Sequence, residues 1–259
     1  MSEPIIRFVD VTKAYGDEAI LERFSLDIGK GEFLTIIGSS GCGKTTLLKM
    51  INGLLIPDTG TVCVQGQDIS KTDLIALRRN IGYAIQGVGL FPHMTVRKNI
   101  AYVPSLLNRQ NRQKTEAAVA RLVKIVGLDQ SLLDRYPSEL SGGQQQRVGI
   151  ARSLAAAPEI LLMDEPFGAV DEITRRMLQD EILRIHRELG VTIVFITHDI
   201  REAMKLGDRV LVMDQGRALQ NDTPRNIYRS PASDFVRQLT RAGSGAEEYG
   251  SFRVFDSDK

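Results

Sequence analysis

The sequence has 259 residues, of which 42% are hydrophobic and 25% charged. This composition is typical of a folded globular protein, and the length allows either one large α/β domain or two intimately packed subdomains. With 33 basic and 32 acidic residues the formal net charge is +1, so the chain has no overall field that attracts nucleic acid, although a local basic patch is not excluded.

The N-terminal sequence and the cysteines indicate a protein of a reducing compartment. Residues 1–4 lack the basic start and apolar core of a signal peptide, and no window of the chain approaches the ~18 apolar residues of a membrane span. Cys42 and Cys63 do not have the spacing of metal ligands, so we expect free thiols. We expect neither export nor a membrane span, and action at a membrane would then need a partner.

Short strands are predicted near the N-terminus. Ile5 to Tyr15, Phe24 to Ile28 and Thr61 to Val64 are separated by Gly and Asp turns, which favours an antiparallel sheet. Between them, the apolar run Phe33 to Ile37 leads into a glycine-rich loop. The loop consists of Gly38, Ser39, Ser40, Gly41, Cys42, Gly43, Lys44 and Thr45.

This loop has the pattern of a phosphate cradle. Its glycines let the backbone N–H groups point inward, and a helix beginning near Lys44 adds its positive dipole end. Lys44 would reach the β- and γ-phosphates, the Thr45 hydroxyl would bind Mg²⁺, and Thr46 would lie beside the nucleotide. The loop therefore predicts a site for a nucleoside triphosphate.

The middle third of the chain is predicted to be helical. Thr115 to Val126 and Gln144 to Ala156 show helical patterning without a strong apolar run, which indicates an inserted helical subdomain. Ser141 is a good N-cap, and Gly142 and Gly143 leave backbone N–H groups uncovered ahead of Gln144. This helix start is either a second anion site or simply a loop with a helix cap.

Two continuous apolar runs, Ile160 to Met163 and Thr192 to Ile196, predict central parallel strands covered on both faces. Apolar residues at helical spacing between them predict a crossover helix. Those residues are Ile173, Met177, Leu178, Ile182, Ile185 and Leu189.

Three polar residues follow these strands, and the carboxyl ends of parallel strands meet at one edge of a sheet. We expect Asp164 to hold Mg²⁺ and Glu165 to polarise the attacking water. His198 should face the same site and contact the γ-phosphate or the water, whereas His186 on the crossover helix is expected to be structural. Short helices are predicted near Pro224 to Tyr228 and Ser233 to Leu239, and residues 242–259 are expected to be a loose tail.

Taken in order, these motifs resemble the ATP-binding cassette family. The resemblance rests on the phosphate loop, Gln86, the segment from Leu140 to Gln144, Asp164-Glu165, Gly168 to Asp171, and His198, and it covers roughly residues 5–240. It implies an α/β fold with a P-loop NTPase (RecA-like) core at about 1–89 and 158–241, an antiparallel β subdomain and an inserted helical subdomain at about 90–157. It also implies ATP and Mg²⁺ as cofactors, with residues 1–241 as the ATP-binding domain.

The family resemblance further implies a homodimer in which each ATP lies between one subunit's phosphate loop and the other's Ser141, Gly142, Gly143 and Gln144. Tyr15 matches the aromatic residue that stacks on adenine, but it could equally be a half-exposed tyrosine at a strand end. Gln86 matches the glutamine that touches Mg²⁺ and links the core to the helical subdomain. Asp171 matches an aspartate at the dimer contact, with Val170 and Gly168 as mild departures from the family pattern.

The segment Leu77 to Gln86, together with Gly89 to Val96, is similar to cassettes that import glycine betaine, choline, carnitine and related quaternary amines. The resemblance implies separate permease subunits, an extracytoplasmic binding protein and a peripheral place on the cytoplasmic face of the inner membrane. We expect Leu90, Phe91, Met94 and Val96 to form an exposed groove edge for a membrane subunit, or else an ordinary packed loop. Many cassettes of this subgroup carry regulatory modules after the cassette, whereas this sequence stops at Lys259. We therefore do not expect osmotic gating through such modules.

Other functions stay open at this stage. Cassettes for taurine, nitrate, polyamines or amino acids such as methionine share these motifs, and substrate binds in subunits outside this chain. A soluble cassette acting on nucleic acid or ribosomes is disfavoured because such chains usually carry two cassettes or a long arm. A scaffold without turnover is disfavoured because Lys44, Glu165 and His198 are all present.

Overall fold

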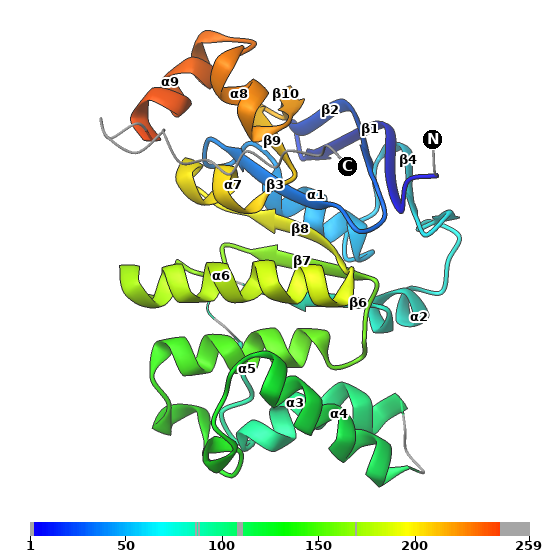
Figure 1. Cartoon of the computed structure of the whole chain (residues 1–259). Helices are drawn as coiled ribbons and strands as arrows, with labels where there is room; N and C mark the ends of the chain where they lie inside the picture. Colours follow the sequence, from blue (N-terminus) through cyan, green and yellow to red (C-terminus); the bar gives the residue numbers. More distant parts are fainter. Residues whose placement is uncertain (1–2, 86, 88, 108–110, 169, 244–259) are drawn as a thin grey trace, which may run out of the picture.

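The computed structural model describes residues 3–85, 87, 89–107, 111–168 and 170–243, and within these residues the strands form two sheets (Figure 1). The smaller sheet has the order β2-β1-β4-β5 with antiparallel pairing throughout, as predicted. Its β2 is longer than predicted, and the two-residue β5 is too short to show an alternating pattern. The strands are β1 (Ile6–Tyr15), β2 (Glu18–Ile28), β4 (Thr59–Val64) and β5 (Gln67–Asp68).

The larger sheet has the order β10-β9-β3-β8-β7-β6. All its pairings are parallel except that of β10 with β9, which is antiparallel. The predicted central strands lie side by side, because β7 pairs with β8, and β3 lies next to β8. Its strands are β3 (Phe33–Gly38), β6 (Ile81–Ala84), β7 (Ile160–Asp164), β8 (Thr192–Ile196), β9 (Arg209–Asp214) and β10 (Arg217–Asp222).

Helices and the smaller sheet cover the larger sheet, and together they bury both faces of its central strands. The helices are α1 (Lys44–Ile51), α2 (Leu74–Arg79), α3 (Val96–Leu107), α4 (Arg112–Ile125), α5 (Gly142–Leu154), α6 (Glu172–Leu189), α7 (Ile200–Leu206), α8 (Pro224–Arg229) and α9 (Asp234–Gly243).

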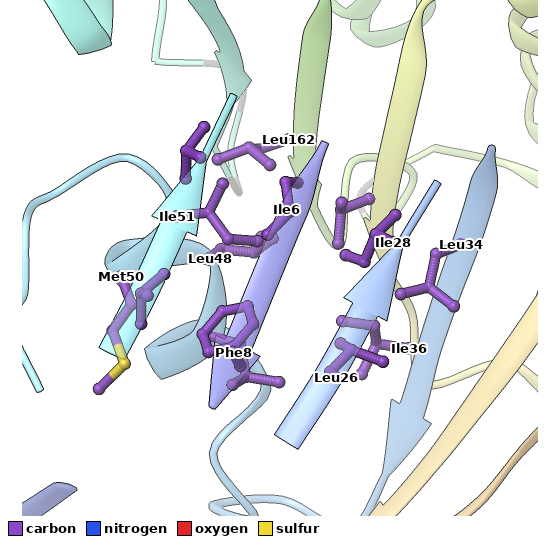
Figure 2. Packing of buried hydrophobic residues seen from close by; sticks show 14 of the residues in the cluster. Ile6, Phe8, Leu26, Ile28, Leu34, Ile36, Leu48, Met50, Ile51 and Leu162 are labelled. Carbon is purple, nitrogen blue, oxygen red and sulfur yellow. The ribbon is translucent and has the colours of Figure 1, made fainter. Parts of the chain in front are cut away.

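One core lies between the two sheets and contains α1 (Figure 2). Leu48 and Ile51 of α1 lie among Ile6 of the smaller sheet and Leu162 of the larger one. Alternate residues of β7, such as Leu161, belong to a second core on the opposite face, together with residues of α6 and α5. This alternation between two apolar cores explains the continuous apolar runs in the sequence.

The crossover helix α6 joins β7 to β8 as predicted, but its apolar stripe is narrower than predicted. Leu178, Ile182 and Ile185 are fully buried. Ile173 and Met177 are also apolar, yet they are 75% and 55% exposed, because at about 100° per residue they lie on a different side of the helix from the buried residues. The predicted crossover helix is present, but these two residues do not belong to its buried face.

Helices α3, α4 and α5 pack together at the β6 side of the larger sheet (Figure 1). The chain leaves the sheet after β6 and returns at the neighbouring parallel strand β7, so these helices form an enlarged crossover connection. Helices α4 and α5 were predicted, but α3 was not, since Pro104 lies inside it.

The expected exposed groove edge is also wrong in part. Val96 is 1% exposed and lies in the core of the helical region, where Leu90 packs against the same cluster. Phe91 is half-buried and its ring lies 4.9 Å from that of Tyr102, centroid to centroid.

Near the C-terminus, α7, α8 and α9 enclose a small core around Val210, Val212 and Ile227. Both predicted short helices are present there as α8 and α9, while residues 244–259 lie outside the described part of the chain. No helix among the described residues combines the length and apolarity needed to cross a membrane.

Candidate nucleotide site

The glycine-rich loop follows β3, which lies between β9 and β8 in the middle of the larger sheet. It ends where α1 begins at Lys44. Gly43 caps that helix with a φ of 100°, in a backbone region that side chains other than glycine rarely adopt. A Cβ at Gly43 would also lie 2.9 Å from Cδ2 of Leu21, so the loop packs closely on β2. The structure therefore contains the predicted strand, loop and helix in the predicted order.

Lys44 is turned into the loop. Its Nζ donates hydrogen bonds to the backbone oxygens of Gly38 at 2.9 Å and Ser39 at 2.8 Å, and the residue is only 9% exposed. These carbonyls hold the ammonium group at the start of the loop. The positive end of α1 and this ammonium group together favour an anion at the same place.

Thr45 and Asp164 are brought together from elements far apart in the sequence. The Thr45 Oγ1 donates to Asp164 Oδ1 at 3.4 Å, across the gap between α1 and the carboxyl end of β7. Burial raises the pKa of Asp164, the Thr45 hydrogen bond opposes that rise, and the neighbouring charge of Glu165 adds to it. A hydroxyl and a carboxylate at this distance are the oxygen ligands that Mg²⁺ takes alongside substrate phosphates, so the residues fit this ion.

Glu165 and His198 follow β7 and β8 at the same edge of the sheet. Glu165 has a φ of 44° and its backbone N–H donates to the oxygen of Ile196 at 3.0 Å. Its Oε2 lies 3.6 Å from Nδ1 of His198, whose side chain is 66% exposed. The structure therefore brings these two predicted residues together beside Asp164. His186, in contrast, contacts the backbone oxygen of Gly31 through Nε2 at 3.0 Å, far along the strands from this edge.

Asp214 was not singled out in the sequence, yet it contacts the loop. The Ser39 Oγ donates to Asp214 Oδ1 at 2.6 Å, so the end of β9 supports the loop on the side opposite Asp164. Asp214 ends a strand just as Asp164 does, and that position was the available signal. The apolar run from Val210 to Met213 in β9 is a further sequence signal for a parallel strand beside β3.

The remaining loop residues differ in exposure. Ser40 and Gly41 are exposed, Cys42 is 3% exposed, and Thr46 faces the interior at 9% exposure. Tyr15 is 51% exposed and pairs with Glu18 across the turn between β1 and β2. Gln86 lies outside the described residues, as does Ala169, so the structure adds nothing to their predicted roles.

The second predicted anion site is the start of α5. Ser141 is its N-cap, and the Ser141 Oγ accepts from the Gln144 backbone N–H at 3.3 Å while the Gln144 Oε1 accepts from the Ser141 N–H at 2.9 Å. This reciprocal capping box defines the helix start, with Gly142 exposed and Gly143 half-buried. Helix α5 packs mainly on α3, α4, α6 and β6, whereas α1 packs mainly on β3, β4, β7 and β8. The two predicted anion sites therefore belong to different parts of the molecule.

Asp171 is the N-cap of α6. Its carboxylate accepts from the Thr174 backbone N–H at 3.0 Å and from the Thr174 hydroxyl at 2.7 Å. These hydrogen bonds lower the pKa of Asp171. Thr174 in turn lies against Gly143 of α5. Neither contact of Thr174 had a signal in the sequence, because threonine is common in a first helical turn.

Comparisons with known proteins agree with this architecture. The family model described as ABC transporter matches residues 21–168. The chain resembles a solved ATP-binding cassette, MJ0796, in a dimeric post-hydrolysis state bound to ADP and Pi, at 32% identity and a TM-score of 0.77 over 85% of this chain and 99% of that one. It also resembles CbiO1 from Clostridium perfringens, at 27% identity and a TM-score of 0.82 over 93% of this chain and 98% of that one. The fold is that of a P-loop core with an antiparallel β subdomain and a helical subdomain, and the chain belongs to the ABC transporter family.

Among curated proteins, the carnitine transport ATP-binding protein OpuCA of Listeria monocytogenes is 52% identical over 91% of this chain and 59% of its own length. The glycine betaine/carnitine/choline transport ATP-binding protein OpuCA of Bacillus subtilis is 49% identical over 91% of this chain and 62% of its own length. The glycine betaine uptake system ATP-binding protein YehX of Escherichia coli is 48% identical over 91% of this chain and 76% of its own length. The chain thus spans about three fifths of the first two relatives.

Proposed function

We propose that this chain is the ATP-hydrolysing subunit of an ABC importer and that it works as a homodimer. In this dimer each ATP would lie between the phosphate loop of one copy and the Ser141 to Gln144 helix start of the other. The observation that carries the proposal is the separation of the two sites. The start of α1 has Lys44, Asp164 and Glu165 around it. The start of α5 has no lysine in its sequence, and this helix packs mainly among other helices. The MJ0796 cassette, which is dimeric in two solved structures, supports a dimer.

In the proposed reaction, the ammonium group of Lys44 and the loop amides bind the β- and γ-phosphates. Thr45 and Asp164 would hold Mg²⁺, with Gln86 as a further candidate, and the ion would neutralise charge on the phosphates. Glu165 would accept a hydrogen bond from the attacking water and polarise it, while His198, 3.6 Å from Glu165, would contact the γ-phosphate or the water. The backbone N–H groups of Ser141, Gly142 and Gly143 from the second copy would stabilise charge on the γ-phosphate. Tyr15 would stack on the adenine ring.

The same chain, we propose, energises the uptake of quaternary amines such as glycine betaine, choline or carnitine through separate membrane subunits. Relatives of about 50% identity are named for transport of these solutes. An extracytoplasmic binding protein would deliver the solute, and the cassette would sit peripherally on the cytoplasmic face of the inner membrane. The near-neutral charge of the chain argues against nucleic acid as its partner.

A second solute class has specific support. The sulfate/thiosulfate import ATP-binding protein CysA of Thermosynechococcus vestitus is 46% identical over 89% of this chain and 68% of its own length. Cassette sequences for chemically different solutes therefore differ only slightly in their similarity to this chain. Reconstitution with partner membrane and binding-protein subunits separates the classes. Glycine betaine, choline or carnitine should stimulate ATP hydrolysis and sulfate should not; stimulation by sulfate alone would assign the second class.

The variant Glu165→Gln tests the proposed hydrolysis. Glutamine keeps the shape of the side chain but is a far weaker acceptor for a proton, so ATP turnover should fall by about 10²-fold or more while ATP still binds. Light scattering should then show a dimer in the presence of ATP. Glu159→Gln is the matched control, because Glu159 lies just before β7, at the opposite end of that strand. Wild-type turnover in Glu165→Gln would remove Glu165 from its role, and a monomer at every ATP concentration would contradict the dimer.

A further inference from the structure

Gly143 is small for a reason that lies within its own chain. A Cβ built on Gly143 would lie 2.5 Å from Cγ2 of Thr174 on α6, closer than real Cβ contacts. The same construction at Gly142 meets no atom within 4 Å. The two neighbouring glycines at the start of α5 therefore differ: Gly142 faces open space, while Gly143 allows α5 to approach the first turn of α6.

Three groups of Thr174 contact either Gly143 or Asp171. Its methyl group fills the space at Gly143, and its backbone N–H and hydroxyl both donate to the carboxylate of Asp171, at 3.0 Å and 2.7 Å. Arg175, the next residue, donates through Nη2 to the backbone oxygen of Val170 at 3.4 Å and thereby supports the same turn. The helix start at Ser141 and the carboxylate at Asp171 are thus fastened to one residue.

We propose that Thr174 is a positioning residue that sets the distance between the Ser141 to Gln144 helix start and Asp171. The inference rests on the proposed dimer, in which the helix start of one copy faces the ATP site of the other and Asp171 lies at the dimer contact. Because Thr174 contacts both, a change at Thr174 would shift the helix start relative to Asp171. An ATP bound to the phosphate loop of the second copy would then meet a helix start whose place relative to the dimer contact is set by Thr174.

The first test uses the free protein without nucleotide and compares thermal unfolding. Gly143→Ala should lower Tm by roughly 5 °C or more, because the added methyl overlaps Thr174, whereas Gly142→Ala should change Tm by much less. Adding Thr174→Ser to Gly143→Ala removes the overlapping methyl and keeps the hydroxyl on Asp171, so the double variant should recover most of the lost Tm. Equal Tm values for the two glycine variants, or no recovery in the double variant, would overturn the contact.

The second test measures ATP hydrolysis and separates positioning from folding. Thr174→Val keeps the methyl group and loses the hydroxyl bond to Asp171, so kcat should fall by about 10-fold or more while the KM for ATP is unchanged. Thr174→Ser keeps that bond but loses the methyl group at Gly143, so its kcat should fall by less than that of Thr174→Val. A change in KM alone, or equal kcat losses in the serine and valine variants, would overturn the positioning role.

The two tests fail independently. If the wild-type protein does not hydrolyse ATP or does not dimerise with it, the proposed function fails, while the Tm comparison still reports whether Thr174 determines the glycine at 143. If the wild type is active and the Tm comparison fails, only the inference about Thr174 is lost.

Discussion

Glu202 on α7 is an acid placed where water is excluded. It is 5% exposed, and its Oε1 accepts from Nε2 of Gln179 on α6 at 2.9 Å. Burial raises its pKa, and hydrogen bonds from Thr197 and Gln179 only partly oppose that rise. Since Thr197 directly precedes His198, this carboxyl group connects the crossover helix to the loop at the candidate site.

The raised pKa gives Glu202 a definite pH dependence. Below the unfolded pKa of 4.5 the group is neutral in both states, so it contributes its full stability there. As pH rises, Glu202 ionises first in the unfolded chain. Its contribution to stability therefore falls steadily, until the pH exceeds the raised pKa of the folded state. The variant Glu202→Gln should therefore gain in Tm relative to the wild type as pH rises above 4.5, measured by thermal melts at stepped pH.

Glu159 provides a control of opposite sign for this measurement. Its pKa is lowered, first by the hydrogen bond from Lys30, and it is exposed. Its small contribution is present above the unfolded pKa and disappears as pH falls, so Glu159→Gln should not gain in Tm as pH rises. A flat difference between Glu202→Gln and the wild type would show that Glu202 has an ordinary pKa.

At the scale of elements, the end of α6 depends on one glycine. Gly190 caps the helix with a φ of 61°, its N–H donates to the oxygen of His186 at 2.9 Å, and a Cβ there would meet no atom within 4 Å. Gly190→Ala therefore tests backbone strain without a clash. It should cost about 1 kcal/mol and lower Tm by about 3 °C, and Gly190→Asn should lower Tm by less, as measured by calorimetry.

Gly168→Ala is the control for this element, since Gly168 has no positive φ and its nearest neighbour would lie 3.6 Å away. It should leave Tm close to that of the wild type. If Gly190→Ala and Gly168→Ala have the same Tm, the choice of glycine at the left-handed cap of α6 does not contribute to stability.

Local chemistry explains which elements were predictable. The phosphate loop, the Ser141 cap and the strand before Asp164 each have their signal within a few consecutive residues, so the sequence predicted them. The bond from Ser39 to Asp214 joins residues 175 positions apart, and no local pattern reports it. Ile173 and Met177 are apolar residues of α6 that lie off its buried face, and which side of a helix is buried depends on the tertiary fold. Helix α3 was missed because Pro104 contradicts a helical pattern.

At the scale of the whole molecule, the proposed dimer makes each site depend on two copies. Lys44→Ala disables the phosphate loop and Ser141→Arg blocks the start of α5, so each variant alone should lose ATP hydrolysis. Mixed, the two variants form heterodimers in which one of the sites has both Lys44 and Ser141 intact. ATPase activity should therefore return on mixing, as measured by phosphate release.

The double variant carrying both changes is the control for mixing. Paired with the wild-type chain, it forms heterodimers in which neither site is intact, so the heterodimers add no activity. If mixing the two single variants restores nothing, each chain hydrolyses ATP by itself or not at all, and the shared site is wrong.

The phosphate loop is held on both sides by the neighbouring strands. Ser39 is bound to Asp214 of β9, Lys44 to the carbonyls of Gly38 and Ser39, and Thr45 to Asp164 of β7. Ordering a free loop on binding would cost roughly 1–2 kcal/mol per residue in conformational entropy. These contacts order the loop when the chain folds. Little of the binding free energy of ATP is therefore needed to order the phosphate loop.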